Sequence, residues 1–382
     1  MEPDDMAIQT MTFRDFMEWS LLDPEIGYYT HRAKIGFTGN DFVTAPEVSP
    51  VFSLLISEQI MELDRYLENP EKFYLIEAGP GNGTLMRSIL TYLRLIDSHL
   101  FDRVHPILIE ASPVLRQFQE KQLSGLMLKN PPLWMDMQTL SLSNIEGVIL
   151  GNEFLDALPA HWVSMTNGEL MEIHVELEKD GIVKKVQKPL LNPEVKNYFD
   201  WIGVQLPEGC EAEISLDAIS ILEKLDSVMS RGFMLWIDYG DRSAEKYSER
   251  RNRGTLRGFK GHQLIDQVLD HPPGSIDLTV HVDFTGVLKR LLELGHRLEG
   301  YSDQMSYLIA LGIEQVLEEN RLSETEALAA ATLIHPLQMG RIFKVLLTSK
   351  GVVQKERLKG FPREALLPLL LSDHEYEKKD LI

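Results

Sequence analysis

Short apolar runs alternate with amphipathic segments over residues 73–156. The runs KFYLIEAG, HPILIEAS and EGVILGNEF each contain a few aliphatic residues and end near a glycine or a carboxylate side chain. Runs of this length predict buried parallel strands. Segments 84–96 and 112–122 have apolar residues at helical spacing, and Pro113 occupies a favoured first helical position. Strands separated by helices predict right-handed crossovers and a mostly parallel, twisted sheet covered on both faces.

The pattern changes in the middle of the chain. Residues 161–187 alternate Val, Ile and Leu with polar residues around two turn signals, Asn167-Gly168 and Asp180-Gly181. This arrangement is typical of β-hairpins and predicts an antiparallel insertion. Further strands are expected at GFMLWID, IDLTVHVDF and RIFKVLLTS, with a helix at about 285–294. The first 70 residues are mostly helical in pattern, with a polar, glycine-rich loop at 36–40. This loop and the helical run that follows it are either a lid over a ligand or an ordinary connector.

Composition narrows the choice of partners. The 382 residues are 44% hydrophobic and 25% charged, which is ordinary globular usage. Lysine and arginine number 38 and aspartate and glutamate 58, so the formal net charge is −20. A chain this acidic repels a phosphate backbone, so nucleic acid is not expected as a partner, whereas a basic or arginine-bearing protein is.

Cellular location is predicted from the cysteine count and the N-terminus. The single cysteine, Cys210, excludes a disulfide framework and is compatible with a reducing compartment. The first residues, MEPDDMAIQT, resemble neither a secretory signal nor a mitochondrial transit peptide. The apolar runs are also far shorter than the roughly 20 residues of a transmembrane helix. We therefore expect a cytoplasmic protein that does not insert into membranes.

The strongest local motif is EAGPGNGT at residues 77–84, between a predicted strand and a predicted helix. Glycines there allow a sharp turn and let a ligand lie against bare backbone, near the free N–H groups of a helix start. No Gly-Lys-Ser/Thr follows, which excludes a P-loop, and the spacing of Gly79, Gly81 and Gly83 fits the dinucleotide fingerprint poorly. The pattern instead resembles motif I of class I S-adenosylmethionine methyltransferases. The alternative is a tight turn without a ligand.

Carboxylates follow the next two predicted strands. Glu110 ends the second run, where it could accept hydrogen bonds from a ribose diol. Asn152, Glu153 and Asp156 follow the third run. One turn of helix would place Glu153 and Asp156 on the same side, where the pair could hold a guanidinium. The alternatives are a capping role for Asn152 and a solvated helix-start acid at Asp156. Asp238, at the end of a later strand, is either a turn residue or part of the same edge.

An ordered series of motifs resembles one family, the MidA-type methyltransferases, which include a mitochondrial complex I assembly arginine methyltransferase and bacterial relatives. The resemblance runs nearly from end to end. Its stretches are PEIGYYT (24–30), GNDFVTAPEVSPVF (39–52), EAGPGNGTL (77–85), GNEFLDALPAH (151–161), IDYGD (237–241), GTLRGFKGHQ (254–263), DLTVHVDF (277–284) and MGRIFKVL (339–346).

The resemblance implies a Rossmann-like class I methyltransferase of the α/β class that uses S-adenosylmethionine. Its implied divisions are an N-terminal helical lid segment (1–70), a methyltransferase core (71–160 and 232–350), a substrate-side insertion (161–231) and a C-terminal tail (351–382). The residues implied to contact the donor are Glu47, Glu77, Gly79, Gly81, Gly83, Glu110 and Asn152. Glu153 and Asp156 are implied to face the acceptor as catalytic residues. Asn82 stands where the family often has arginine.

The family activity implied for mitochondrial members is symmetric dimethylation of an arginine in a complex I subunit. We expect the −20 charge to attract a basic protein substrate, and a homodimer is a further expectation. Two other functions remain open: a small-molecule methyltransferase on the same core, and a non-catalytic assembly factor that binds the donor. Scattered histidines without ligand spacing give no support to a metal site.

Overall fold

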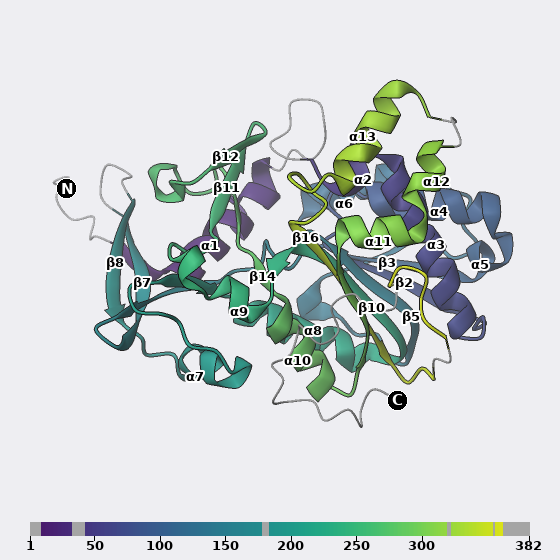
Figure 1. Ribbon diagram of the computed structural model, residues 1–382. Helices are drawn as coiled ribbons and strands as arrows, with labels where there is room; N and C mark the ends of the chain where they lie inside the picture. Colours follow the sequence, from purple (N-terminus) through teal and green to yellow (C-terminus); the bar gives the residue numbers. More distant parts are fainter. Residues whose placement is uncertain (1–8, 33–42, 178–182, 319–321, 354–355, 362–382) are drawn as a thin grey trace. The chain divides into compact units, whose positions relative to one another are not determined.

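The computed structural model describes residues 9–32, 43–177, 183–318, 322–353 and 356–361 (Figure 1). Contacts divide the chain into two compact units. The first unit combines the described part of Met1–Val43 with Asp156–Ser220 and Asp241–Asp283. The second unit combines Thr44–Leu155, Ile221–Gly240 and the described part of Phe284–Ile382. The domain boundaries expected from the sequence stay a prediction.

The second unit contains a mostly parallel sheet whose strands follow the order β15-β16-β10-β5-β2-β3-β4. Parallel pairs join β2 to β3 and β5, β3 to β4, and β5 to β10. β16 lies antiparallel between β10 and β15. The strands are β2 (Phe73–Ala78), β3 (Val104–Ile109), β4 (Leu133–Met135), β5 (Ile145–Asn152), β10 (Met229–Asp241), β15 (Arg297–Asp303) and β16 (Phe343–Lys350).

The strand register places several carboxyl ends at the same edge of this sheet. Ala78 of β2 pairs with Ile109 of β3 on one side and with Gly151 of β5 on the other. Asn152 of β5 pairs in turn with Ile237 of β10. Because the chain passes from β2 to β3 in one direction and reaches β5 in the other, the strand order reverses at β2. Ligands in such sheets bind outside the carboxyl ends of the strands at this reversal.

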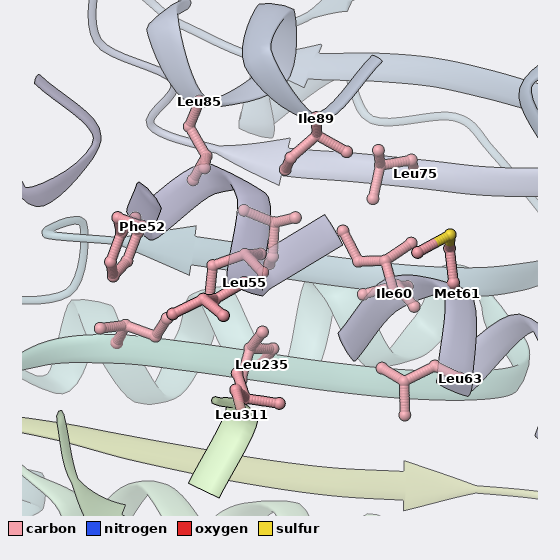
Figure 2. Packing of buried hydrophobic residues seen from close by; sticks show 14 of the residues in the cluster. Phe52, Leu55, Ile60, Met61, Leu63, Leu75, Leu85, Ile89, Leu235 and Leu311 are labelled. Atoms are coloured by element: carbon pink, nitrogen blue, oxygen red, sulfur yellow. The ribbon is translucent and has the colours of Figure 1, made fainter. Parts of the chain in front are cut away.

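Helices of the second unit supply its hydrophobic core. Figure 2 shows Leu55 and Ile60 of α3 packed among Leu75, Leu235 and Leu311, and all five residues are buried. Burying a side chain of this size stabilises the fold by about 1.5–3 kcal/mol relative to leaving it exposed. The helices are α2 (Ala45–Val48), α3 (Pro50–Tyr66), α4 (Thr84–Ile96), α5 (Ser98–Arg103), α6 (Pro113–Leu123), η2 (Met137–Thr139), α10 (Phe284–Glu293), α11 (Gln304–Leu311), α12 (Ile313–Glu318) and α13 (Glu324–Ile334).

The first unit is built on antiparallel strands. Its larger sheet has the order β1-β7-β6-β9, with β8 also pairing with β7, and its smaller sheet has the order β12-β11-β13. Asn167 and Gly168, both with positive φ (55° and 77°), make the tight turn between β6 and β7. The strands are β1 (Gln9–Thr12), β6 (His161–Thr166), β7 (Glu169–Leu177), β8 (Val183–Pro189), β9 (Glu211–Ile214), β11 (Arg257–Lys260), β12 (Gln263–Ile265), β13 (Asp277–Thr279) and β14 (Val282–Asp283).

Helical segments complete the first unit. α1 packs against β6 and β7 through buried residues such as Phe13 and Met17. The segments are α1 (Phe13–Leu22), η1 (Tyr28–Arg32), α7 (Pro193–Ile202), α9 (Ser243–Lys246), η3 (Glu249–Arg251) and η4 (Val268–Asp270). α8 (Leu216–Val228) begins in this unit, and its residues from Ile221 onward belong to the second unit. No helix within the described ranges is both long and apolar enough to cross a membrane.

The predicted α/β architecture is confirmed: a mostly parallel sheet with antiparallel additions. The helix predicted at 84–96 forms over Thr84–Ile96, and the Asn167-Gly168 hairpin forms as expected. The prediction of one strand at IDLTVHVDF was wrong, because Val280 donates its N–H to the Asp156 carbonyl and His281 donates to the Thr255 hydroxyl, which separates β13 from β14. The Asp180-Gly181 turn and the glycine-rich loop at 36–40 lie outside the described residues.

Candidate functional site

The loop after β2 adopts a backbone conformation that favours glycine. Gly79, Gly81 and Gly83 have φ values of +64°, +54° and +86°, in the left-handed region that other residues rarely enter. Gly83 is also the N-cap of α4. A Cβ added at Gly79 would lie 2.5 Å from Cδ2 of Phe154, which follows β5. The loop therefore turns sharply and lies close to the segment after the neighbouring strand.

Asn82 and Glu47 connect this loop to α2. The Asn82 side-chain oxygen accepts hydrogen bonds from the backbone N–H of Thr84 (3.0 Å) and from its hydroxyl (2.7 Å). Its amide nitrogen donates to Oε1 of Glu47. Oε2 of Glu47 accepts from the Thr44 N–H at 3.2 Å, which completes a capping box at the start of α2. Burial raises the pKa of Glu47, against these hydrogen bonds.

Glu110 follows β3 directly and is almost completely buried. Its Oε1 accepts a hydrogen bond from the Ser112 N–H (2.8 Å), and its Oε2 accepts from the side-chain amide of Gln119 (3.0 Å). The same Gln119 amide donates to the Gly81 carbonyl at 2.7 Å. Burial raises the pKa of Glu110 to about 7. Gln119 thus joins the second-strand carboxylate to the glycine loop.

Sequence reasoning missed Gln119, although the sequence contains a signal. Gln119 lies four residues after Leu115 and four before Leu123, on the apolar face of α6, and it is fully buried. A buried polar side chain needs partners, so an amide on that face indicates a specific hydrogen-bonding role. Its Oε1 accepts from Nε1 of Trp134 at 2.9 Å.

Glu77 lies within β2, two residues before the first glycine of the loop. It is 3% exposed, and burial raises its pKa to about 8. Among the residues that the structure describes, its Oε2 has no hydrogen-bond partner. A buried carboxyl oxygen without a partner is costly unless a ligand or a proton satisfies it. Glu77 therefore offers a buried carboxyl oxygen that could accept a hydrogen bond from a bound ligand.

Glu153 has a strained backbone at the end of β5. Its φ is +52°, an uncommon value for a residue other than glycine and one that costs on the order of 1–3 kcal/mol. Its N–H donates to the Ile237 carbonyl at 2.9 Å. Its Oε1 accepts from the Ala45 N–H (3.1 Å) and from the Asn152 side chain (3.2 Å). These contacts hold the carboxylate beside the first residue of α2.

Asp238 of β10 fixes the segment that follows Glu153. One of its oxygens, Oδ2, accepts hydrogen bonds from the backbone N–H groups of Phe154 (3.1 Å) and Leu155 (2.8 Å). Residues 153–156 form bends and a turn, not the helical turn that we expected from the spacing of Glu153 and Asp156. Asp156 belongs to the first unit, where it is buried and its carbonyl accepts from the Val280 N–H at 3.0 Å.

The edge of the second unit's sheet therefore gathers the glycine loop, Glu47, Glu77, Glu110, Asn152 and Glu153 on neighbouring segments. It combines bare backbone with carboxylate and amide groups, which suits a polar ligand carrying hydroxyl and ammonium donors. The Oδ1 atom of Asn152 has no hydrogen-bond partner among the described residues. Within the described ranges, no group of three or more His, Cys, Asp or Glu side chains is placed to hold a metal ion.

Comparisons with known proteins all find methyltransferases. A family model described as "Putative S-adenosyl-L-methionine-dependent methyltransferase" matches residues 55–302. The protein arginine methyltransferase NDUFAF7, mitochondrial, of Xenopus tropicalis is 30% identical over 379 residues, which cover 91% of this chain and 84% of that protein. Its Drosophila melanogaster homolog is 28% identical over 372 residues, covering 89% and 81%.

A solved structure extends the similarity to three dimensions. It is a "likely methyl transferase" from Burkholderia thailandensis, bound to S-adenosyl-homocysteine. It matches with a TM-score of 0.80 and 29% identity, covering 93% of this chain and 91% of that one. The family model spans more than half of the chain and includes the glycine loop, Glu110 and Glu153. The chain therefore belongs to this family of S-adenosyl-L-methionine-dependent methyltransferases.

Proposed function

We propose that this protein transfers the methyl group of S-adenosylmethionine to an arginine side chain of a protein substrate, with symmetric dimethylarginine as the product. The observation that carries the proposal is the strained Glu153, whose carboxylate is held at the end of β5 beside the first residue of α2. Relatives about 30% identical over most of the chain are named protein arginine methyltransferases, which supports the choice of acceptor.

Donor binding is assigned to the glycine loop and its neighbours. The left-handed backbone of Gly79, Gly81 and Gly83 lets the chain turn sharply between β2 and α4, so that the backbone of this loop can lie against the donor. Glu110 receives the ribose hydroxyls, and its orientation is set by Ser112 and Gln119. The other donor-contacting residues in this proposal are Glu47, Glu77 and Asn152. The unpartnered buried oxygens of Glu77 and Asn152 fit a ligand with donor groups.

Glu153 acts on the acceptor. When bound, the donor supplies a methyl group activated by its sulfonium leaving group, so positioning of the acceptor provides most of the rate. A guanidinium is protonated up to a pKa above about 12, and a carboxylate can orient it through paired hydrogen bonds. Glu153 orients the reacting nitrogen and receives the proton that this nitrogen releases. We propose Asp156 as a second acceptor-facing carboxylate.

The overall charge of −20 helps to attract a basic substrate, and this attraction weakens as salt is added. The cytoplasmic location and the homodimer expected from the sequence stay predictions. The proposal is tested by methyl-label transfer from S-adenosylmethionine into a cell extract, followed by hydrolysis of the labelled proteins. Labelled dimethylarginine supports it. Label in low-mass compounds alone indicates a small-molecule methyltransferase, and donor binding without any transfer indicates an assembly factor.

A further inference from the structure

A surface groove with a volume of about 510 Å³ lies in the second unit, where α4 packs against α6. Both helices can be followed in Figure 1. The groove is lined by residues of α4, of the C-terminal half of α6 and of the turn that follows it. Its lining includes Arg87, Thr91, Arg94, Phe118, Lys121 and Leu126.

The groove is basic in a strongly acidic chain. Arg87, Arg94 and Lys121 contribute three positive charges, and no aspartate or glutamate is among the lining residues. Within the described part of the chain, none of these three side chains forms an ion pair or a hydrogen bond. Other cations of the second unit differ in this respect: Arg103 pairs with Asp64 at 2.6 Å, for example. The three charges are available to an anionic ligand.

The sequence of α4 separates this basic face from the core. Arg87, Thr91 and Arg94 are spaced by four and three residues and therefore lie on one side of the helix. Its buried positions, including Leu85 and Ile89, pack into the hydrophobic core. The core thus sets the orientation of α4, and the basic face points away from it as a fixed feature of the fold.

Apolar side chains accompany the charges. Phe118 lines the groove and is 51% exposed, and Leu126 lines it beside Met127, which is 85% exposed. Leu95 and Ile96, immediately after Arg94, are 72% and 60% exposed. Exposed apolar side chains gathered beside charged ones are typical of protein interaction sites. A simple anion would make no use of them.

We propose that this groove binds a short acidic peptide segment of a partner protein, with apolar side chains between its carboxylates. The two arginines can each take a carboxylate through paired hydrogen bonds, while Phe118 and Leu126 contact the apolar positions. The overall charge of −20 repels a long polyanion such as a nucleic acid, or an extended anionic membrane, far more than a short peptide whose few carboxylates all lie within the basic groove. An arginine-bearing segment would be repelled by the groove itself, so the bound segment is distinct from the methyl acceptor.

The test measures peptide binding to the full-length protein by fluorescence anisotropy at low salt. The probe is a fluorescein-labelled pool of heptapeptides in which aspartate or glutamate alternates with leucine or phenylalanine. Two matched pools serve as comparisons. In the first, asparagine or glutamine replaces the acidic residues; in the second, alanine replaces the apolar residues. The variant is Arg94→Glu with Lys121→Glu. The control, Lys224→Glu with Arg341→Glu, makes the same charge change at exposed positions elsewhere in the second unit.

The proposal predicts that the acidic, apolar pool binds and that affinity falls at least about tenfold for the groove variant but not for the control. Both substituted pools should bind more weakly. The proposal fails if the groove variant and the control bind equally, or if no pool binds. It also fails if the alanine pool and the acidic, apolar pool bind with equal affinity and inorganic phosphate displaces both. That result would indicate a site for small anions. Wild-type self-association that the groove variant abolishes would instead assign the groove to a second copy of the chain.

Discussion

The side-chain amide of Asn82 donates a hydrogen bond to Oε1 of Glu47, and this bond joins the glycine loop to the start of α2. Asn82 therefore has a role in the site although it lies between two glycines. The proposal that Glu47 contacts the donor makes this bond part of the donor-binding arrangement.

Asn82→Ala is expected to weaken binding of S-adenosylhomocysteine by about tenfold. A hydrogen bond to a carboxylate contributes roughly 1.5–3 kcal/mol, and its loss affects ligand binding only in part, through the position of Glu47. Isothermal titration calorimetry measures the change. The control is Asn197→Ala, at an exposed position on α7. Equal affinity of both variants would show that Glu47 keeps its position without Asn82.

Gly79→Ala is expected to destabilise the protein by about 2–4 kcal/mol, because it combines a left-handed backbone with a contact of 2.5 Å to the Phe154 ring. Urea unfolding measures the loss. Gly125→Ala is the matched control, since a Cβ there meets nothing within 4 Å and its φ is not positive. If Gly79→Ala is as stable as Gly125→Ala, the loop does not need glycine at this position.

Glu77 should make stability depend on pH. Burial raises its folded pKa to about 8, above that of the unfolded chain, so the folded state binds more protons between these two values. Its contribution to stability is complete below the unfolded pKa of about 4.3 and is lost as pH rises toward 8, at up to about 1.4 kcal/mol per pH unit.

Glu77→Gln is accordingly expected to lose less stability than the wild type between pH 5 and pH 8, as measured by urea unfolding at several pH values with roughly unit spacing. Glu314→Gln, at an exposed position on α12, should retain the wild-type pH dependence. A Glu77→Gln curve parallel to the wild-type curve would mean that the Glu77 carboxyl is ionised in the folded protein at neutral pH.

Ile60→Ala should remove about 2–5 kcal/mol of stability, since Ile60 of α3 is fully buried in the cluster drawn in Figure 2. Leu328→Ala is the control, because Leu328 of α13 is 74% exposed and should cost less than about 0.5 kcal/mol. The free energies of unfolding of the two variants are compared from their urea midpoints, provided that the denaturant dependence (the m-value) is unchanged. A similar small loss for both would contradict the central place of α3 in the core.

The parts of the fold that the sequence predicted well depend on local signals. Thr84–Ile96 has a clear helical period, and the three glycines between a strand and a helix indicate their turn directly. Strand β1 was missed because its four residues become a strand only by pairing with β7, some 160 residues later in the chain. Long-range pairing of this kind leaves little trace in a short segment.

In the candidate site, too, local sequence signals could be predicted and long-range contacts could not. Glu110 and Glu153 could be identified because each follows an apolar run. The left-handed backbone of Glu153 could not be predicted from the sequence. It depends on the hydrogen bond from the Glu153 N–H to the Ile237 carbonyl and on the bonds from Phe154 and Leu155 to Asp238. These partners lie more than 80 residues away in the chain, so their effect appears only in the folded protein.

In the proposed reaction Glu153 acts on the acceptor and not on the donor. Methyl transfer to protein arginine by Glu153→Gln, compared with wild type and Glu314→Gln, tests it most directly, with S-adenosylhomocysteine affinity measured on all three. Glu153→Gln is expected to transfer methyl groups about 100-fold more slowly, with an affinity for S-adenosylhomocysteine within about twofold of the wild type. Unchanged transfer by Glu153→Gln, with donor binding intact, would contradict it.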